Sequence, residues 1–302
     1  KAILESGIKC NLSRGLTVFD DSGYEQTAAY QDNLRLLDEW NGMNGGRLLA
    51  DLCIHGEYTS TPKVVEAVAA QAKARGARMH IHLSETQAEH EECKQRHGMT
   101  PAAYMQARSV FDAPTTAAHC VWLEGEDFDI LKDHGVTVAC CPASNLKLAS
   151  GYANVPRMLE MGINVALGTD GAASNNNLNI LQDLYLFAVA YKGYYHDSTL
   201  ITPAQALYAA TRAGAISQGR GDCGRLAVGC RADLCVINTD TPQFIPMTDA
   251  ACNVVYAAQG ADVCLTMVDG EVLYRDGTYT TIDIEKVKAE AQRHTDAILR
   301  SL

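Results

Sequence analysis

The stretch Met79-His80-Ile81-His82-Leu83-Ser84-Glu85 brings two histidines and a carboxylate close together. Side chains alternate along a β-strand, so His80 and His82 would point to the same side of it. Glu85 would follow at the carboxyl end of that strand, where a loop begins. Such a group suggests a metal site or general acid–base chemistry. The alternative is an ordinary strand that happens to carry histidines, and the rest of the chain decides between the two.

Strand-like and helix-like segments alternate on both sides of this stretch. Short continuous apolar runs, typical of strands buried on both faces, are followed by segments with helical spacing of apolar residues. The predicted strands are 8–12, 47–54, 77–83, 115–119, 136–141 and 163–167, and the predicted helices are 24–40, 61–75, 87–97, 100–110, 127–134, 155–161, 178–191 and 202–216. This alternation predicts an α/β fold with a parallel sheet.

Polar residues fall at the carboxyl ends of the predicted strands. They are Arg14, His55, His82, Glu85, His119, Asn145 and Asp170. One such residue would be a turn or a cap, but a polar residue at the end of each of six successive strands indicates a TIM-type barrel with its active site at that rim. A doubly wound open sheet is the alternative, although its site would gather at a single crevice.

The pattern changes after residue 216. Glycines punctuate the next residues, and short strands follow at 232–237, 254–256, 263–268 and 271–274, with turns at Asp269-Gly270 and Asp276-Gly277. We therefore expect residues 1–216 to form part of the barrel, residues 217–282 a small β unit, and residues 283–302 an amphipathic terminal helix.

Composition excludes several classes of function. The formal net charge is -11 and no run of Lys or Arg occurs, which argues against a nucleic acid or an anionic membrane as partner. The longest apolar runs are strand-sized, so no membrane-spanning helix is expected. The 11 cysteines are an odd number without paired spacing, and Cys140-Cys141 lie on a predicted buried strand. We interpret them as reduced core residues of a cytoplasmic protein.

Four motifs resemble the amidohydrolase superfamily, and within it the 5'-methylthioadenosine/S-adenosylhomocysteine deaminases. The motifs are His-Leu-Ser-Glu-Thr at 82–86, Ala-His-Cys-Val at 118–121, Pro-Ala-Ser-Asn-Leu-Lys-Leu at 142–148 and Gly-Thr-Asp-Gly-Ala-Ala-Ser-Asn-Asn at 168–176. The segment 224–234 resembles the small β-sandwich domain of that superfamily. The resemblance covers essentially the whole chain, and it implies a (β/α)8 barrel of which about strands 3 to 8 are present here.

The resemblance also implies roles for individual residues. His82 and Asp170 resemble metal ligands, and the metal would be a single divalent ion, with Zn²⁺ as the first candidate and Fe or Mn as alternatives. Glu85 resembles the glutamate that protonates the purine ring nitrogen, and His119 resembles the histidine that contacts the attacking water. Asp170 and His119 would take the proton of that water and pass it on, so Asp170 is a catalytic residue as well as a ligand. The implied reaction converts an adenosine-type nucleoside to its inosine analogue and ammonia.

Substrate contacts follow from the same resemblance. His55 and Arg14 resemble residues that contact the ribose and the group beyond the 5' position. The substrate would be 5'-methylthioadenosine, S-adenosylhomocysteine or adenosine, and the family implies a homo-oligomer.

Simpler interpretations stand beside these. Asp170 before Gly171 could be a turn residue, and His119 could be a core histidine. The whole chain could be a related amidohydrolase, such as a guanine deaminase or a triazine chlorohydrolase. It could also be an inactive fragment or a scaffold paralogue. The remaining histidines are expected at the surface; they are His90, His97, His134, His196 and His294.

One departure from the family concerns the metal. The first barrel strand of the family carries a His-x-His motif, and no segment before Ile8 can form that strand. We therefore expect the full protein to be longer, with two further metal ligands outside this chain. His80 would then lie one layer deeper in the barrel than His82, as a packed residue or a neighbour of a ligand.

Overall fold

The computed structural model describes all 302 residues, and its centre is a set of parallel strands in chain order. These strands are β1 (Cys10–Leu12), β2 (Leu48–Ala50), β3 (Leu52–Ile54), β4 (Met79–Leu83), β5 (Thr115–His119), β6 (Thr137–Cys140) and β7 (Val165–Leu167). β1 pairs with β2, and β3 to β7 form one five-stranded sheet. Neighbours in sequence are thus neighbours in space, which is the strand order of a TIM-type barrel. The predicted fold class is confirmed.

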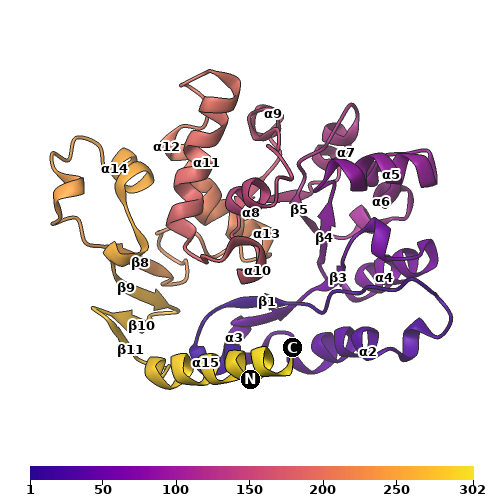
Figure 1. Cartoon of the computed structure of the whole chain (residues 1–302), viewed down its shortest axis with the longest axis horizontal. Helices are drawn as coiled ribbons and strands as arrows, with labels where there is room; N and C mark the ends of the chain where they lie inside the picture. Colours follow the sequence, from indigo (N-terminus) through magenta and orange to yellow (C-terminus); the bar gives the residue numbers. More distant parts are fainter.

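Helices connect successive strands and cover the sheet. α4 (Pro62–Arg75), α5 (Gln87–His97), α6 (Pro101–Ala107) and α7 (Asp127–Asp133) lie outside β3, β4 and β5, on the side away from the small sheet (Figure 1). The other helices of the barrel part are α1 (Ala2–Ser6), α2 (Ala28–Arg35), α3 (Met43–Gly46), α8 (Pro142–Lys147), α9 (Val155–Glu160), α10 (Ala172–Asn175), α11 (Ile180–Tyr195), α12 (Pro203–Tyr208) and α13 (Gly214–Ser217).

Strand β4 shows why the site faces inward. Met79, Ile81 and Leu83 are buried in the 43-residue apolar core, whereas His80 and His82 alternate with them and are half-buried. Because alternate side chains leave a strand on opposite faces, packing the apolar set against the helices directs both histidines to the other face of the sheet.

Three predicted elements differ from the structure. The helix predicted for 24–40 is broken at Thr27, whose extended backbone and side chain cap α2. The strand predicted for 47–54 is interrupted at Asp51. The strand predicted for 254–256 is wrong, because these residues belong to α14 (Ala250–Ala257), which Asp249 caps. Packing of Val255 in the core outweighs the β preference of valine there.

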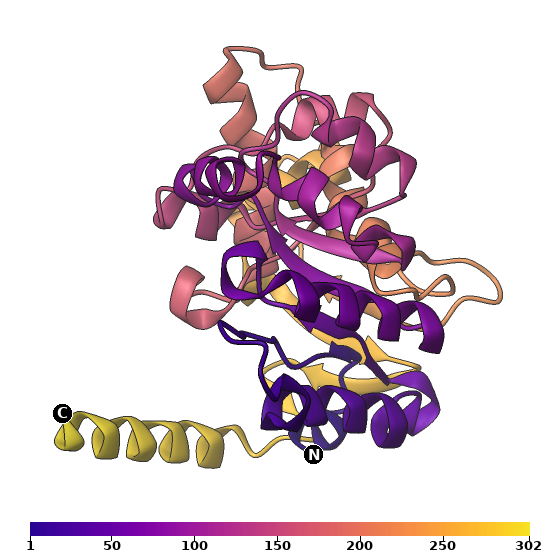
Figure 2. The same ribbon diagram turned by 90° about the vertical axis from the view of Figure 1, so that its right-hand side faces the viewer.

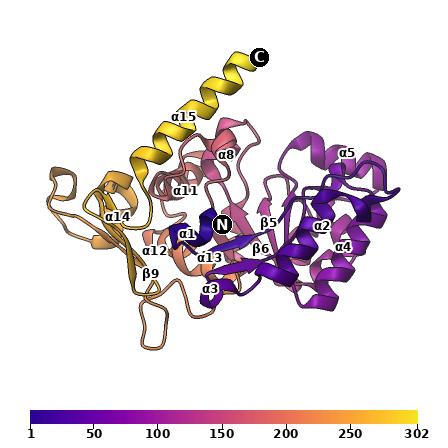
Figure 3. The ribbon, with the colours of Figure 1, turned by 90° about the horizontal axis from the view of Figure 1, so that it is seen from below.

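A four-stranded antiparallel sheet follows the barrel part. It consists of β8 (Leu234–Ile237), β9 (Val263–Val268), β10 (Glu271–Arg275) and β11 (Thr278–Tyr279), in the order β11-β10-β9-β8. Both predicted Asp-Gly turns join neighbouring strands, with positive φ at Asp269 and Asp276. The chain ends in α15 (Ile284–Ser301), which extends away from the body and buries none of its residues (Figures 2 and 3). None of the helices combines the length and the apolar character that crossing a membrane requires.

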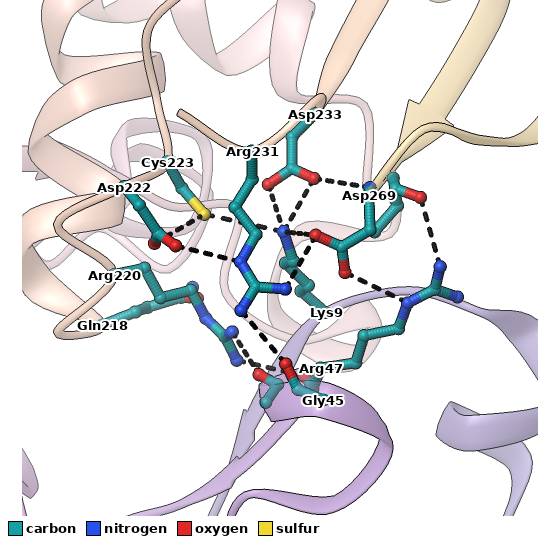
Figure 4. A network of polar contacts seen from close by, with 12 residues as sticks. Lys9, Gly45, Arg47, Gln218, Arg220, Asp222, Cys223, Arg231, Asp233 and Asp269 are labelled. Atoms are coloured by element: carbon teal, nitrogen blue, oxygen red, sulfur yellow. Dashed lines mark hydrogen bonds and ion pairs between the residues drawn. The ribbon is translucent and has the colours of Figure 1, made fainter. Parts of the chain in front are cut away.

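An ionic network joins the small sheet to the start of the barrel (Figure 4). The Nζ of Lys9 lies 2.7 Å from Asp233 Oδ1 and 2.7 Å from Asp269 Oδ1, and the Lys9 side chain is only 10% exposed. Arg47 and Arg231 also contact Asp269. Burial alone would raise the pKa of the two carboxyls, but hydrogen bonds and the charge of Lys9 outweigh it and lower both pKa values.

We expect Lys9→Met to lower the free energy of unfolding at neutral pH by about 2 kcal/mol, because it leaves two carboxylates partly buried beside each other. A carboxyl whose pKa is lower in the folded state than in the unfolded state stabilises the folded protein at pH values above the unfolded-state pKa of about 4. This stabilisation is lost as the pH falls through the folded-state pKa. The difference in free energy of unfolding between wild type and Lys9→Met should therefore be smaller at pH 3 than at pH 7. Urea unfolding at pH 7 and pH 3 measures both effects.

Lys288→Met is the matched control, because Lys288 forms an exposed pair with Glu285 on α15. This control should change stability by less than about 0.5 kcal/mol. Equal effects of the two substitutions would contradict a structural role for the network.

Candidate active site

Three histidine rings lie in a row where the strands of the sheet end. His55 follows β3, His82 is in β4 and His119 ends β5. The ring centroids of His55 and His82 are 4.8 Å apart, and those of His82 and His119 are 5.4 Å apart with nearly parallel planes. The parallel register of the strands brings the three rings together, so three of the residues predicted for the site share one location.

The ring of His82 is held in one orientation. Its Nδ1 lies 2.6 Å from the backbone carbonyl oxygen of His55, so Nδ1 carries the hydrogen that this oxygen accepts. The lone pair is then on Nε2, which is the arrangement found in metal-binding histidines. His82 therefore has the tautomer that a metal ligand needs.

Glu85 and His119 face each other next to this row. His119 Nε2 is 3.7 Å from Glu85 Oε2, and His119 Nδ1 is 2.9 Å from Asn145 Oδ1. Because the amide oxygen of Asn145 only accepts, His119 donates from Nδ1 and keeps its Nε2 lone pair toward Glu85. His119 and Asn145 are buried, whereas Glu85 remains partly open to solvent. Carboxyl and imidazole groups are side-chain types that act as general acids and bases.

Asp170 lies on the loop after β7 and is held by two donors. The Ser144 hydroxyl donates to Oδ2 at 2.7 Å, and the Gly171 amide donates to Oδ1 at 2.6 Å. Burial works against ionisation, but these hydrogen bonds, with the nearby His119, lower the pKa of the Asp170 carboxyl. Asp170 is therefore an anion at neutral pH.

The backbone is left-handed at three of these strand ends. The φ angles are 48° at Ser84, 70° at His119 and 62° at Asp170. Such a conformation costs a residue other than glycine about 1 kcal/mol or more, and it persists only where the surroundings enforce it. The loops of the rim are thus held in conformations that the chain alone would not favour.

Sequence reasoning missed two buried carboxylates that support these loops. Glu89 of α5 accepts hydrogen bonds from the backbone amides of Ser84, at 2.9 Å, and Glu85, at 2.7 Å. Burial raises the pKa of Glu89, although these amides oppose the shift. The pattern Thr86-x-x-Glu89 is that of a capping box, which could have identified this glutamate.

The second is Asp183 of α11, which is fully buried. It accepts from the amide of Ala143 at 3.0 Å and from the side chain of Asn175 at 2.9 Å, and Asn175 also donates to the carbonyl of Thr169. Asp183 thus links α8, which follows β6, to α10, which follows β7 and Asp170. An acidic residue within an apolar helix was the only available signal in the sequence.

Two of the histidines expected at the surface lie elsewhere. His90 is 1% exposed, and its Nδ1 is 3.1 Å from the Ser84 hydroxyl. His97 is partly buried and contacts Glu57 at 2.7 Å. His90 faces inward toward the Ser84 hydroxyl, whereas His97, at the other end of α5, lies against Glu57 and Tyr104. The surface prediction was wrong for His90, and His97 keeps only part of its side chain exposed.

Arg14 is the last of the predicted site residues, and His80 was expected as a packed neighbour of His82. The backbone of Arg14 exchanges two hydrogen bonds with the buried side chain of Asn33, which leaves the guanidinium exposed and free of ion pairs. His80 lies behind His82, with ring centroids 6.5 Å apart, and burial lowers the pKa of His80 to about 4. His80 is therefore neutral at physiological pH, and Arg14 makes no contact with the histidine row.

The fold and the rim place the chain in a known class. The amidohydrolase family pattern matches residues 25–273, and the chain belongs to the amidohydrolase family. It is 40% identical over 293 residues to the 5-methylthioadenosine/S-adenosylhomocysteine deaminase of Moorella thermoacetica. The aligned residues make up 97% of this chain and 68% of the relative. The chain thus spans about two thirds of the length of that relative.

Solved structures with the same fold contain zinc. The adenosine deaminase from Xanthomonas campestris with bound zinc matches with a TM-score of 0.92 at 26% identity, over 99% of this chain and 68% of that one. The atrazine chlorohydrolase from Arthrobacter aurescens TC1 complexed with zinc matches with a TM-score of 0.88 at 26% identity, over 97% of this chain and 67% of that one. The predicted superfamily is confirmed, whereas the domain boundaries, the homo-oligomer and the cytoplasmic location stay predictions.

The residues on the rim fit part of a metal site. His82 has a free Nε2 and Asp170 is anionic, so both are suitable ligands for a divalent metal. No three His, Cys, Asp or Glu side chains of this chain form a group that could hold a metal ion. His82 and Asp170 therefore offer donor atoms of the types that a divalent metal binds, and the two further ligands expected from the family would join them.

Proposed function

We propose that the chain carries the catalytic rim of a metal-dependent hydrolytic deaminase for adenosine-type nucleosides. The substrates would be 5'-methylthioadenosine, S-adenosylhomocysteine or adenosine, and the products the inosine analogue and ammonia. The observation that carries this proposal is the Glu85–His119 pair, 3.7 Å apart, beside a histidine whose Nε2 is free for a metal. The names of the similar proteins support the same reaction.

His82 and Asp170 would hold the metal, and zinc is the ion in the similar structures. A divalent metal, when bound, lowers the pKa of water and supplies a nucleophile at neutral pH. The chain supplies the orientation: the His55 carbonyl fixes the ring of His82, and the Ser144 hydroxyl fixes the carboxylate of Asp170.

Glu85 and His119 would move the protons. Water adds its oxygen to C6 of the purine while Glu85 donates a proton to the adjacent ring nitrogen. His119 Nε2 accepts the proton that the water gives up, because Asn145 keeps its Nδ1 protonated. Return of that proton to the amino group lets ammonia leave, and the hydroxyl hydrogen left on C6 passes to Glu85 as the C6 carbonyl forms. Glu85 thus regains its proton, and one water is consumed for each ammonia released.

His55 and Arg14 would contact the substrate away from the purine. His55 is half-buried beside His82, and its Nδ1 is 3.1 Å from the Thr59 hydroxyl. The free guanidinium of Arg14 is suited to a carboxylate or another polar 5' substituent. The partner is a small molecule, and the acidic net charge gives no support for nucleic acid.

A direct test compares substrates under one assay. We expect the metal-loaded protein to release ammonia from the three adenosine-type nucleosides in preference to guanine. Preferred release of ammonia from guanine, or of chloride from atrazine, would contradict the proposal. The triazine reaction is the second candidate, because the atrazine chlorohydrolase shares the fold over 97% of this chain.

We expect Glu85→Gln to lower kcat by at least about 100-fold, because glutamine cannot donate and regain the proton. Metal content should stay unchanged, because Glu85 is not one of the proposed ligands. Steady-state assays and elemental analysis measure the two quantities. Glu91→Gln, on the exposed side of α5, is the control and should behave like wild type. Near-normal turnover of Glu85→Gln would refute the assigned role.

A further inference from the structure

Helix α8 and the loop that follows it support both members of the Glu85–His119 pair. Asn145 of α8 holds His119 through its side chain, as described above. The hydroxyl of Ser150, on the loop after α8, donates to Glu85 Oε1 at 3.2 Å. Ser150 is only 4% exposed, so this contact is screened from solvent. One short segment, 145–151, therefore contacts the base from its helical end and the acid from its loop end.

The position of Ser150 is fixed by its own backbone. Its amide donates to the carbonyl of Asn145 at 2.8 Å, and its carbonyl accepts from Trp122 Nε1 at 2.8 Å. Gly151 follows with φ 123°, and a Cβ there would lie 3.1 Å from Val121. The loop therefore closes against the segment that follows His119, and the glycine is needed for this approach.

These contacts make the two oxygens of Glu85 different. Oε1 accepts from Ser150, and Oε2 faces His119 Nε2. A protonated carboxyl carries its hydrogen on one oxygen while the other acts as the carbonyl-type acceptor. A hydroxyl aimed at Oε1 favours the acceptor role there and leaves the hydrogen on Oε2.

We propose that Ser150 is a positioning residue for the deamination, which directs the mobile proton of Glu85 to Oε2, the oxygen that faces His119. Ser150 acts through Glu85 and need not touch the substrate. The inference rests on the proposed function, because it concerns the proton that Glu85 transfers. It assigns to the segment 145–151, the end of α8 and the loop after it, the task of orienting acid and base together.

The test replaces the hydroxyl in two ways in the metal-loaded protein. Ser150→Ala and Ser150→Cys, which nearly preserves the volume, should each lower kcat about tenfold with KM within about twofold. Ser150→Thr keeps the hydroxyl and should recover most of the lost kcat. Ser217→Ala, which removes a buried hydroxyl bonded to a helix carbonyl, is the control and should leave kcat unchanged.

Each result has one interpretation. A kcat equal to that of wild type in both Ser150→Ala and Ser150→Cys would overturn the inference. The inference also fails if Ser150→Thr has a low kcat although its thermal unfolding midpoint equals that of wild type. Crystal structures of wild type and Ser150→Cys add a readout that is independent of turnover. Glu85 Oε2 should stay near His119 in wild type and turn away from it in Ser150→Cys. A Glu85 carboxylate in the same position in both structures would also overturn the inference. If wild type deaminates no adenosine-type nucleoside, the proposed function itself fails, which is a distinguishable outcome.

Discussion

Left-handed backbone at the ends of the parallel strands is the constraint on which the rest of the site depends. Ser84, His119 and Asp170 adopt positive φ where β4, β5 and β7 give way to loops. Each residue turns the chain sharply at the point where a functional side chain must face its neighbours. This conformation is unfavourable without glycine, so buried hydrogen bonds have to hold it.

Buried acids and amides provide those hydrogen bonds. Glu89 accepts hydrogen bonds from the amides of Ser84 and Glu85, and Asp183 accepts from Ala143 after β6 and from Asn175 after β7, in the segment that carries Asp170. Because these carboxylates come from α5 and α11, the helices that cover the sheet also set the geometry of its rim. The position of Glu85 on the rim thus depends on Glu89, a residue that the substrate need not contact.

Much of the fold and of the candidate site could be predicted from the sequence, because the spacing of apolar residues indicates strands and helices and the strand-end positions of polar residues indicate the rim. The alternation in Met79 to Leu83 indicated which side of β4 is polar, and the strand-end positions of His82, His119 and Asp170 indicated a shared rim. The burial of His90 and the hydrogen bonds of Asp183 could not be predicted, because they depend on how helices pack in three dimensions. The helix at Val255 shows tertiary packing overriding local preference in the same way.

The central claim is that this rim adds water to a purine ring and expels its amino group. In the most direct measurement, the metal-loaded protein is incubated with 5'-methylthioadenosine in water enriched in a heavy oxygen isotope. Mass spectrometry then gives the mass of the nucleoside product. The account predicts an inosine analogue with one heavy oxygen on the purine and one ammonia released per product. A product without heavy oxygen on the purine, or recovery of unchanged nucleoside, would contradict it.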